Sequence, residues 1–517
     1  MRAYFAKKVN FLSERHNYDL TFALGILLTL AIPPIGFFPI VFLAIPILMW
    51  ATAKSKNALQ AFLGGWTFGL GYFLVGFYWS GIALKEIHRD IFWFFPFFVV
   101  ALPVYIAIYY GFVTMLAFYF RKHLELYVLI FAALFFWFEY LRGIITNFPW
   151  NVMGSVWYEV LPVIQSLSLF GIYGLTFLAI LWAGLPFLLA NRGWATIKGG
   201  LGLVIVLLFA LNFTWGGWRM IQGKTSFNDD VAIKVFHPHI TSEMKKNGGV
   251  FDQYLEMIQE QPSNSSESTT LYVFPETSFD VYNGEYQQSL TKIVSNLPDN
   301  GYAAIGIHRI EGYGPEKNIY NSLILTDKSA NILATYDKFI PAIWGEYLPF
   351  DDFISQTPLG KYTTHMLRIA PGFGPMNLQK GDIPRFSPVI CFEAAFSGRI
   401  IDKESARPEF LLLLSNDAWA SGSVGPYQNF SSARMRAIEE GLPVIRAANV
   451  GISAVFDPYG RELERLGMHE KGVIDSSLPI YAEPTFFSKY GHVPVLWFMG
   501  GLTFILLCIG LVCRNRP

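Results

Sequence analysis

The chain reads Ser-Pro-Val-Ile-Cys-Phe-Glu from Ser387 to Glu393, so a short β-type run ends on the thiol of Cys391. Two other runs end in the same manner. Leu-Tyr-Val-Phe-Pro leads to Glu276, and Ala-Thr-Tyr-Asp leads to Lys338. Because sites in α/β sheets assemble at strand ends, we expect this thiol, carboxylate and ammonium to converge. The pattern predicts a layered α/β domain with a reactive site.

Outward from these residues, segment 222–490 has the texture of such a domain. Short β-rich runs alternate with turns and helical stretches, which is typical of α/β layers. The predicted strands are Val231–Phe236, Leu271–Phe274, Tyr302–Ile307, Ser322–Thr326, Ile332–Tyr336, Val389–Ile390 and Phe410–Leu414.

The rest of the chain is too apolar for an ordinary soluble protein. Of the 517 residues, 53% are hydrophobic and 17% aromatic, so much of the surface must face lipid. Lys plus Arg equals Asp plus Glu at 39 each, which leaves no global field that would attract nucleic acid.

Apolar runs long enough to suggest membrane spans occur on both sides of this domain. Seven precede it and one follows, and the first two are short and separated by Pro33-Pro34, as in a tilted pair or a re-entrant hairpin. We therefore expect a membrane domain over 1–221, a catalytic domain over 222–490 and a C-terminal span over 491–517. The runs are 20–33, 37–51, 60–82, 91–118, 125–141, 162–190, 197–215 and 493–513.

The loop charges predict an orientation, because Lys and Arg collect on the cytoplasmic side. With the N-terminus inside and the first span retained, the catalytic domain is extracytoplasmic and both termini are cytoplasmic. The inside segments then hold Arg2, Lys7, Lys8, Arg15, Lys54, Lys56, Arg121, Lys122, Arg192, Lys198, Arg514 and Arg516. The outside loops hold only Lys85, Arg89 and Arg142.

The three converging side chains suit acyl transfer. A thiol attacks at neutral pH more readily than a hydroxyl, so Cys391 is the candidate nucleophile. Glu276 is the candidate general base and Lys338 the candidate oxyanion stabiliser. A helix beginning at Glu393 would stabilise the thiolate through its N-terminus. Taken singly, Cys391 is more typical of a small buried hydrophobic residue, Glu276 of a loop or helix-cap carboxylate, and Lys338 of a solvated turn.

Other polar residues invite weaker hypotheses. His237 and His239 alternate, but no third ligand lies at a metal-site spacing, so no metal is expected. Glu139 and Arg142 stand at i, i+3, and we interpret them as an ion pair that supports the end of a span. The remaining cysteines, Cys508 and Cys513, lie in the last apolar run, which argues against a disulfide framework.

The motifs together resemble the Glu-Lys-Cys signature of the nitrilase superfamily. With the membrane pattern, the chain resembles the membrane-embedded branch of that superfamily, the bacterial apolipoprotein N-acyltransferases. The resemblance covers essentially the whole chain and implies a multi-span helical membrane domain plus an α-β-β-α sandwich. It rests on Phe274-Pro275-Glu276, Asp337-Lys338, Gly345–Pro349, Cys391-Phe392-Glu393, Ser415–Trp419, Gly425-Pro426, Ala433–Ala437, Asn449–Ala454 and Phe148-Pro149-Trp150.

The resemblance also implies a reaction. Cys391 would take an acyl chain from a phospholipid, phosphatidylethanolamine, and the amine of an apolipoprotein's diacylglyceryl-cysteine would attack the thioester, without a cofactor. The protein would lie in the bacterial inner membrane. Glu346, Glu393 and Asn321 match supporting positions of the family. The candidate substrate-binding residues are Trp150, Tyr347, Phe392 and Trp419.

Two departures from the family concern substrate gating. Lys245-Lys246 stands where Lys-Trp is usual, and Ala420-Ser421 stands where Phe-Gly is usual. Two alternatives stay open at this point. One is a membrane-tethered amidase or nitrile hydrolase that uses water as its second nucleophile, and the other is a non-catalytic protein that binds lipopeptide.

Overall fold

The structure is a computed structural model. It describes residues 17–82, 95–198, 200–240, 244, 249–261, 268–279, 286–312, 317–343, 345–347, 355–357 and 368–514. Within these residues the chain divides into two compact units, which we call the helical unit (17–81, 95–221 and 489–514) and the sheet unit (222–488). Lys245, Lys246, Leu348 and Pro349 lie outside the described residues.

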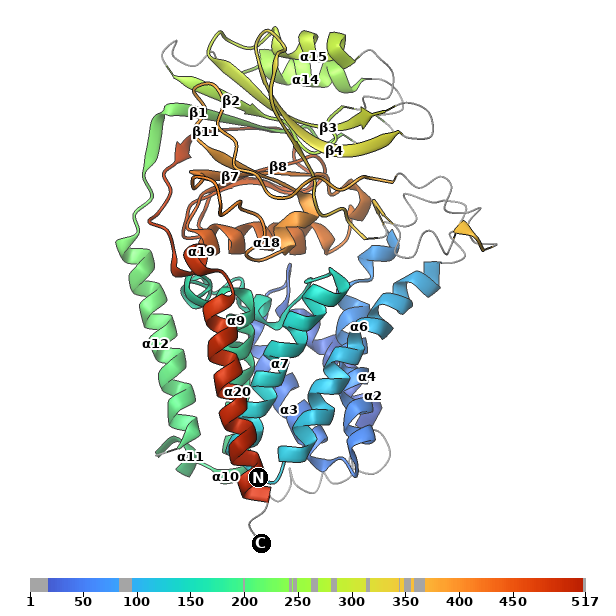
Figure 1. Cartoon of the computed structure of the whole chain (residues 1–517), viewed down its shortest axis with the longest axis vertical. Helices are drawn as coiled ribbons and strands as arrows, with labels where there is room; N and C mark the ends of the chain where they lie inside the picture. The colour runs from blue at the N-terminus through green and yellow to red at the C-terminus, as the bar shows by residue number, and fades with distance from the viewer. Residues whose placement is uncertain are drawn as a thin grey trace. The chain divides into compact units, whose positions relative to one another are not determined.

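The helical unit contains six helices among the described residues that are long and apolar enough to cross a membrane. The chain is therefore a multi-pass membrane protein. Two shorter apolar helices precede them, over Tyr18–Ala31 and Phe38–Lys54. The principal helices, drawn in Figure 1, are α2 (Asn17–Leu28), α3 (Val41–Lys54), α4 (Ala58–Gly76), α6 (Phe95–Ala117), α7 (Leu124–Thr146), α9 (Leu167–Ala183), α10 (Leu185–Arg192), α12 (Leu201–Gln222) and α20 (Val493–Arg514).

Short elements connect these helices. They are η1 (Thr29–Ala31), η2 (Phe38–Ile40), η4 (Phe118–Phe120), η5 (Met153–Trp157), α8 (Leu161–Ile164) and α11 (Ala195–Lys198). The apolar run 162–190 is consequently not one continuous helix. The backbone of Gly171 leaves helical geometry at φ 64°, and Gly184 separates α9 from α10. Glycine tolerates the positive φ that breaks the helix.

Glycines let α4 approach its neighbours closely. A Cβ on Gly71 of α4 would lie 2.2 Å from the carbonyl oxygen of Phe22 in α2, and a Cβ on Gly25 of α2 would lie 2.0 Å from that of Phe68. On another part of α4, a Cβ on Gly65 would lie 2.4 Å from the carbonyl oxygen of Tyr110 in α6. Small residues at helix contacts are how apolar helices pack in lipid, where the hydrophobic effect between them is absent.

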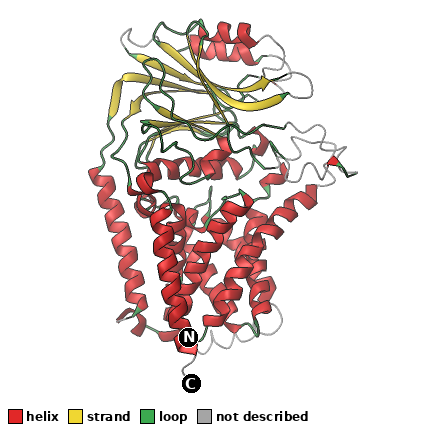
Figure 2. Ribbon diagram, viewed as in Figure 1, coloured by secondary structure: helices red, strands yellow, loops and turns green. Residues whose placement is uncertain are grey.

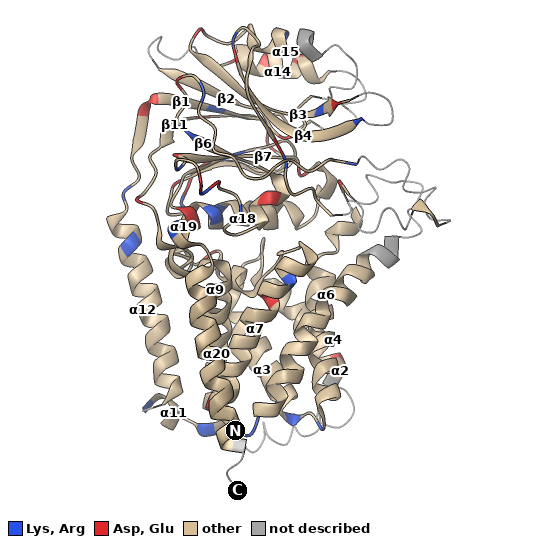
Figure 3. Cartoon of the chain, in the orientation of Figure 1, with Lys and Arg blue, Asp and Glu red and all other residues tan. Residues whose placement is uncertain are grey.

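Glu139 and Arg142 support the end of the span as expected, but they do so through hydrogen bonds to the following segment. Both side chains of α7 are fully buried, and each binds the segment after α7 instead of the other. Glu139 Oε2 accepts from the Met153 backbone N–H at 2.8 Å, whereas Arg142 donates to the carbonyl oxygens of Phe148 and Trp150 at 2.9 and 3.0 Å. A loop whose peptide groups are buried needs such partners. In Figure 3 charged residues are otherwise sparse along the helices of this unit.

The sheet unit holds two sheets (Figure 2). The six-stranded sheet has the order β11-β1-β2-β3-β4-β5, and the five-stranded sheet has the order β10-β9-β8-β7-β6. Their bounds are β1 Phe227–His237, β2 Thr269–Val273, β3 Gly301–Glu311, β4 Asn318–Asp327, β5 Ile332–Asp337, β6 Phe386–Ile390, β7 Phe410–Ser415, β8 Val444–Ala448, β9 Ser453–Phe456, β10 Glu462–Leu466 and β11 Gly472–Pro479. All seven predicted strands are confirmed.

Three buried clusters define the layers of this unit. One joins the two sheets, with Ile233 and Leu325 on one side and Leu412 on the other. A second lies between the six-stranded sheet and the helices α14 (Val250–Gln259) and α15 (Tyr286–Val294). A third lies between the five-stranded sheet and α18 (Gly425–Glu440). Alternate residues of a strand face opposite sides, so each sheet contributes to two cores. The α-β-β-α sandwich is confirmed.

Candidate active site

Glu276 follows β2 and is held by donors from three other segments. Its side chain is 5% exposed. Oε1 accepts from Asn321 Nδ2 at 2.6 Å and lies 3.3 Å from Lys338 Nζ, while Oε2 accepts from the Asn416 backbone N–H at 2.7 Å. These contacts fix the rotamer of a carboxylate that burial would otherwise penalise.

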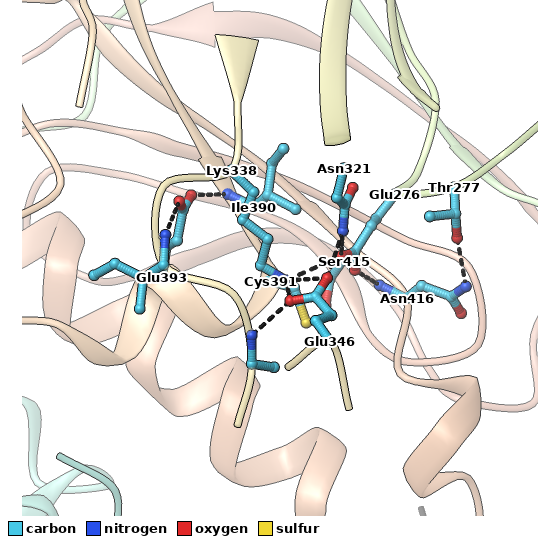
Figure 4. A network of polar contacts seen from close by, with 12 residues as sticks. Glu276, Thr277, Asn321, Lys338, Glu346, Ile390, Cys391, Glu393, Ser415 and Asn416 are labelled. Atoms are coloured by element: carbon cyan, nitrogen blue, oxygen red, sulfur yellow. Dashed lines mark hydrogen bonds and ion pairs between the residues drawn. The ribbon is translucent and has the colours of Figure 1, made fainter. Parts of the chain in front are cut away.

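Lys338 follows β5 and is the cation of the same cluster (Figure 4). Its side chain is 1% exposed, and Nζ lies 2.8 Å from Glu346 Oε2 as well as 3.3 Å from Glu276. Burial alone would lower the pKa of Lys338, but the carboxylates of Glu346 and Glu276 outweigh it and raise that pKa above its usual range. The two carboxylates thus favour the charged ammonium form of Lys338.

Glu346 completes the cation's surroundings. Its Oε2 accepts from the Ala342 backbone N–H at 2.6 Å, and its Oε1 accepts from Asn321 Nδ2 at 2.8 Å. Burial opposes ionisation, yet the Lys338 ammonium lowers the pKa of Glu346 below its usual value. Two carboxylates therefore share one ammonium, and Asn321 donates to both of them.

Cys391 follows β6 directly and has a left-handed backbone with φ 50°. Thr277, next to Glu276, has φ 49°. Positive φ in residues other than glycine is strained and is concentrated at functional sites. The turn sets the thiol, which is 4% exposed, beside the Glu276 and Lys338 cluster, as Figure 4 shows.

The surroundings of Cys391 disfavour the thiolate form. Burial raises the pKa of Cys391 well above its usual range, and the charge of Glu276 adds to this. The Lys338 ammonium and the Ser415 hydroxyl act in the opposite direction, but they do not outweigh burial. A neutral thiol needs a base to become nucleophilic. Glu276 is the candidate base, because it is the carboxylate of this cluster that lies just after the end of a strand.

The segment after Cys391 is not an α-helix. Residues Cys391–Ala395 form a short 3-10 helix, η7, and Phe396 is extended. The Glu393 carboxylate explains the difference. It turns back to accept from the backbone N–H groups of Ile390 at 2.7 Å and Phe339 at 2.8 Å, and from the Tyr336 hydroxyl at 2.9 Å. A single turn has almost no macrodipole to offer a thiolate.

Glu393 instead joins two elements of the site. Its carboxylate ties the turn that carries Cys391 to the segment that carries Lys338. Burial raises the pKa of Glu393 to about 7, although the Ile390 N–H, the Lys338 charge and the Tyr336 hydroxyl oppose the shift. The sequence indicated a supporting role for Glu393 only through the family resemblance. Its spacing does not show that its carboxylate turns back to bind the backbone.

The candidate substrate-binding residues are distributed over both units. Phe392 is 5% exposed and packs edge to face on Phe396 with ring centroids 5.3 Å apart. Tyr347 and Trp419 are partly buried. Trp150 belongs to the helical unit, where it is 3% exposed and its ring centroid lies 5.4 Å from that of Trp79. The Trp150 carbonyl binds Arg142, so the Phe-Pro-Trp segment has fixed internal supports.

Sequence reasoning missed two residues at this site. Asn416 donates its backbone N–H to Glu276 and its side-chain Nδ2 to Thr277 Oγ1 at 2.9 Å. Asn429 of α18 lies within 3.8 Å of the sulfur of Cys391. Asn416 lies within the Ser415–Trp419 motif, which was a signal in the sequence. Asn429 lies in a helix with many polar residues, and its position among them does not distinguish it.

The fold and the arrangement around Cys391 define a class, a membrane-anchored member of the carbon-nitrogen hydrolase group. Carbon-nitrogen hydrolase is the family that matches residues 243–481, and the apolipoprotein N-acyltransferase N-terminal domain matches residues 24–185. The chain is 32% identical to the apolipoprotein N-acyltransferase of Rhodopseudomonas palustris over 95% of its length and 94% of that protein. It belongs to the apolipoprotein N-acyltransferase family.

A second relative has the same name. The enzyme of the same name from Brucella melitensis is also 32% identical, over 96% of this chain and 95% of that protein. Among solved structures, the chain is similar to a cysteine-to-alanine mutant of an amidase of the nitrilase superfamily from Nesterenkonia. That likeness has 17% identity and a TM-score of 0.31, and it covers 50% of this chain and 94% of the amidase.

Proposed function

We propose that this chain transfers an acyl group from a phospholipid, phosphatidylethanolamine, to the N-terminal amine of a diacylglyceryl-cysteine on an apolipoprotein. Membership of the acyltransferase family supports the reaction class. The single observation that carries the mechanism is the buried cluster in which Cys391, Glu276 and Lys338 interact electrostatically. Each of the three follows a strand end, so the sandwich fixes their separation.

In the first half-reaction the sulfur of Cys391 attacks the ester carbonyl while its proton passes to Glu276. Lys338 stabilises the oxyanion of the tetrahedral intermediate. Collapse breaks the ester bond, and the leaving glycerol oxygen takes the proton from Glu276, which releases a lysophospholipid. An acyl thioester on Cys391 remains.

In the second half-reaction the acceptor amine attacks this thioester and gives a proton to Glu276. Collapse of the intermediate expels the sulfur of Cys391, to which Glu276 returns the proton, and an amide is formed. The two steps make a ping-pong cycle that consumes no cofactor. Water must stay out, since it would hydrolyse the thioester, and the slight exposure of all three side chains supports this.

Glu346, Asn321 and Glu393 are the supporting residues of the proposal. Glu346 balances the Lys338 charge, Asn321 fixes both carboxylates, and Glu393 joins the nucleophile turn to the lysine segment. We assign Tyr347, Phe392, Trp419 and Trp150 to substrate contact. Their aromatic faces suit acyl chains and lipopeptide.

The proposal includes a location, the bacterial inner membrane with both termini cytoplasmic and residues 222–490 on the outer side. Residues 1–221 and 491–517 then form the membrane domain. The charge distribution supports this, because Arg192 and Lys198 are the basic residues in the last turns of α10 and α11, and Figure 3 shows blue segments beside the label of α11. Positive charge marks the cytoplasmic side.

The test uses the full chain in micelles with phosphatidylethanolamine that carries a labelled acyl chain. The acceptor is a synthetic lipopeptide with a diacylglyceryl-cysteine and a free amine, and its N-acetylated form is the control. We expect label in the amide of the free-amine peptide and one lysophospholipid for each amide. Label released only as free fatty acid would instead identify a hydrolase. Lipopeptide binding without any Cys391-dependent transfer would identify a binding protein.

A further inference from the structure

Beneath Cys391, on the side of α18, lies a buried polar chain that the proposed mechanism does not use. Asn429 of α18 is 1% exposed. Its Nδ2 lies 3.8 Å from Cys391 Sγ, 3.1 Å from Ser415 Oγ and 2.9 Å from Asp417 Oδ1. The sulfur contact is within hydrogen-bond distance for so large an atom.

Asp417 fixes which way the Asn429 amide points. Asp417 Oδ1 accepts both the Asn429 amide at 2.9 Å and the Ser415 hydroxyl at 3.0 Å. A carboxylate oxygen only accepts, so the amide oxygen of Asn429 cannot be turned to this side. The donor end of Asn429 must therefore face Cys391.

Asp417 is itself held rigidly. It is fully buried, and its Oδ2 lies 2.8 Å from Arg446 Nη2, which is equally buried. Arg446 Nε donates to the Ile452 carbonyl at 2.9 Å, and Gly451 packs so closely that a Cβ there would lie 2.3 Å from Asp417 Oδ2. Arg446 offsets the Asp417 charge, which would otherwise oppose any negative charge on the sulfur.

The NH2 group of the Asn429 side chain has two hydrogens, and three acceptors lie within reach of it: Cys391 Sγ, Ser415 Oγ and Asp417 Oδ1. When the sulfur is a neutral thiol, Asp417 and Ser415 take both of them at the shorter distances. When the sulfur becomes anionic, it is the stronger competitor for the one directed at Ser415. The donor is thus available at the moments when negative charge is on the sulfur, and no proton is transferred.

We propose that Asn429 is a further catalytic residue, which donates a hydrogen bond to the sulfur of Cys391 as it attacks the ester and as it leaves the amide, and that Asp417 and Arg446 are its positioning residues. The assignment rests on the proposed function for its place in the cycle. Its physical content, stabilisation of the Cys391 thiolate, does not depend on any substrate.

The experiment measures alkylation of Cys391 in the full chain by iodoacetamide, resolved by peptide mass, from pH 7 to 9.5. Asn429→Leu removes the donor at similar volume. Its alkylation rate should fall about tenfold at each pH, which corresponds to one unit of thiol pKa. Asn429→His keeps an N–H at the same distance from Cβ and should remain within about threefold of the parent.

Asn377→Leu is the control. Asn377 donates to the Asp402 and Ala406 carbonyl oxygens and to Ser405, so its replacement removes hydrogen bonds that do not involve the sulfur of Cys391. Equal alkylation profiles for the parent, Asn429→Leu and Asn429→His would overturn the assignment. If Asn429→Leu does not fold, Asn429→Ala takes its place beside Asn429→His, and equal rates for these two would also overturn it. The alkylation assay does not require phospholipid turnover. A chain that fails to transfer acyl groups can therefore still show the effect of Asn429 on the thiol, so the two proposals can fail separately.

Discussion

Gly306 of β3 lies directly against the backbone of Glu276. A Cβ at Gly306 would come within 2.6 Å of Glu276 Cα and 2.4 Å of the Pro275 carbonyl oxygen. The carboxylate of the site therefore reaches its position because the neighbouring strand has no side chain at this point.

Gly306→Ala should displace Glu276 and, through overpacking, also cost about 1 to 3 kcal/mol of stability. A shift of about 1 Å at a reacting group costs on the order of a hundredfold in rate, so we expect a comparable loss of acyl transfer in the protein that remains folded. Gly249→Ala is the control, because a Cβ there meets no atom within 4 Å. Equal activities of the two variants would contradict the claim that Gly306 positions Glu276.

Glu393→Gln should uncouple the Cys391 turn from the Lys338 segment. The backbone N–H groups of Ile390 and Phe339 donate to the Glu393 carboxylate. In the variant, the NH2 group of the glutamine would face one of these donors in place of an acceptor. We expect a loss of about 1 to 3 kcal/mol in stability and at least a tenfold loss of activity. The exposed Glu464→Gln is the control. Full activity of Glu393→Gln, measured with the labelled phospholipid, would refute the coupling role.

His237 predicts how stability depends on pH. Burial lowers its pKa from 6.5 to about 4, and the neighbouring His239 adds to the shift. As pH falls, His237 is protonated in the unfolded chain before it is protonated in the folded chain. Its contribution to the free energy of unfolding is therefore complete above pH 6.5 and falls by on the order of 3 kcal/mol as pH drops toward 4. His237→Asn, which keeps a polar group for Ser453, should flatten the decline in thermal midpoint from pH 7 to 5. An unchanged slope would show that His237 does not titrate in this range.

Two glycines of α4 test the helix packing by the same substitution. Gly71→Ala brings a methyl group to 2.2 Å from the Phe22 carbonyl oxygen, whereas a Cβ at Gly64 meets nothing within 4 Å. Overpacking should cost Gly71→Ala about 1 to 3 kcal/mol, while Gly64→Ala should gain up to about 1 kcal/mol from helix propensity. Thermal midpoints in one detergent decide this. Equal midpoints would mean that α2 and α4 do not pack closely at Gly71.

Most of the fold could be predicted from the apolar runs in the sequence. Strands such as Phe410–Ser415 are continuous aliphatic runs, and the spans are long, so composition alone reveals them. The four strands that escaped prediction are polar or short. β8 carries the buried Arg446, and β10 reads Glu-Leu-Glu-Arg-Leu, because a paired charge or an exposed face removes the apolar signal. Such strands are defined by their partners in the sheet.

The site could be predicted as residue types but not as contacts. Strand ends brought Glu276, Lys338 and Cys391 into consideration, but the sequence did not indicate that Glu393 turns back to form hydrogen bonds. It also paired Glu139 with Arg142, although each binds the following loop. Hydrogen bonds to segments outside the helix decide both cases, such as the one that the Glu393 carboxylate accepts from the Phe339 N–H. A helical spacing or a cap signal describes only near neighbours in sequence.

The central claim is that Cys391 becomes an acyl thioester, and intact-protein mass after exposure to phosphatidylethanolamine without acceptor tests it most directly. We expect the parent to gain the mass of one fatty acyl group, which neutral hydroxylamine removes and lipopeptide discharges. Cys391→Ala should gain nothing, and Glu276→Gln should gain it far more slowly. An adduct of the same size on Cys391→Ala, or an unmodified parent that still acylates lipopeptide, would contradict the account.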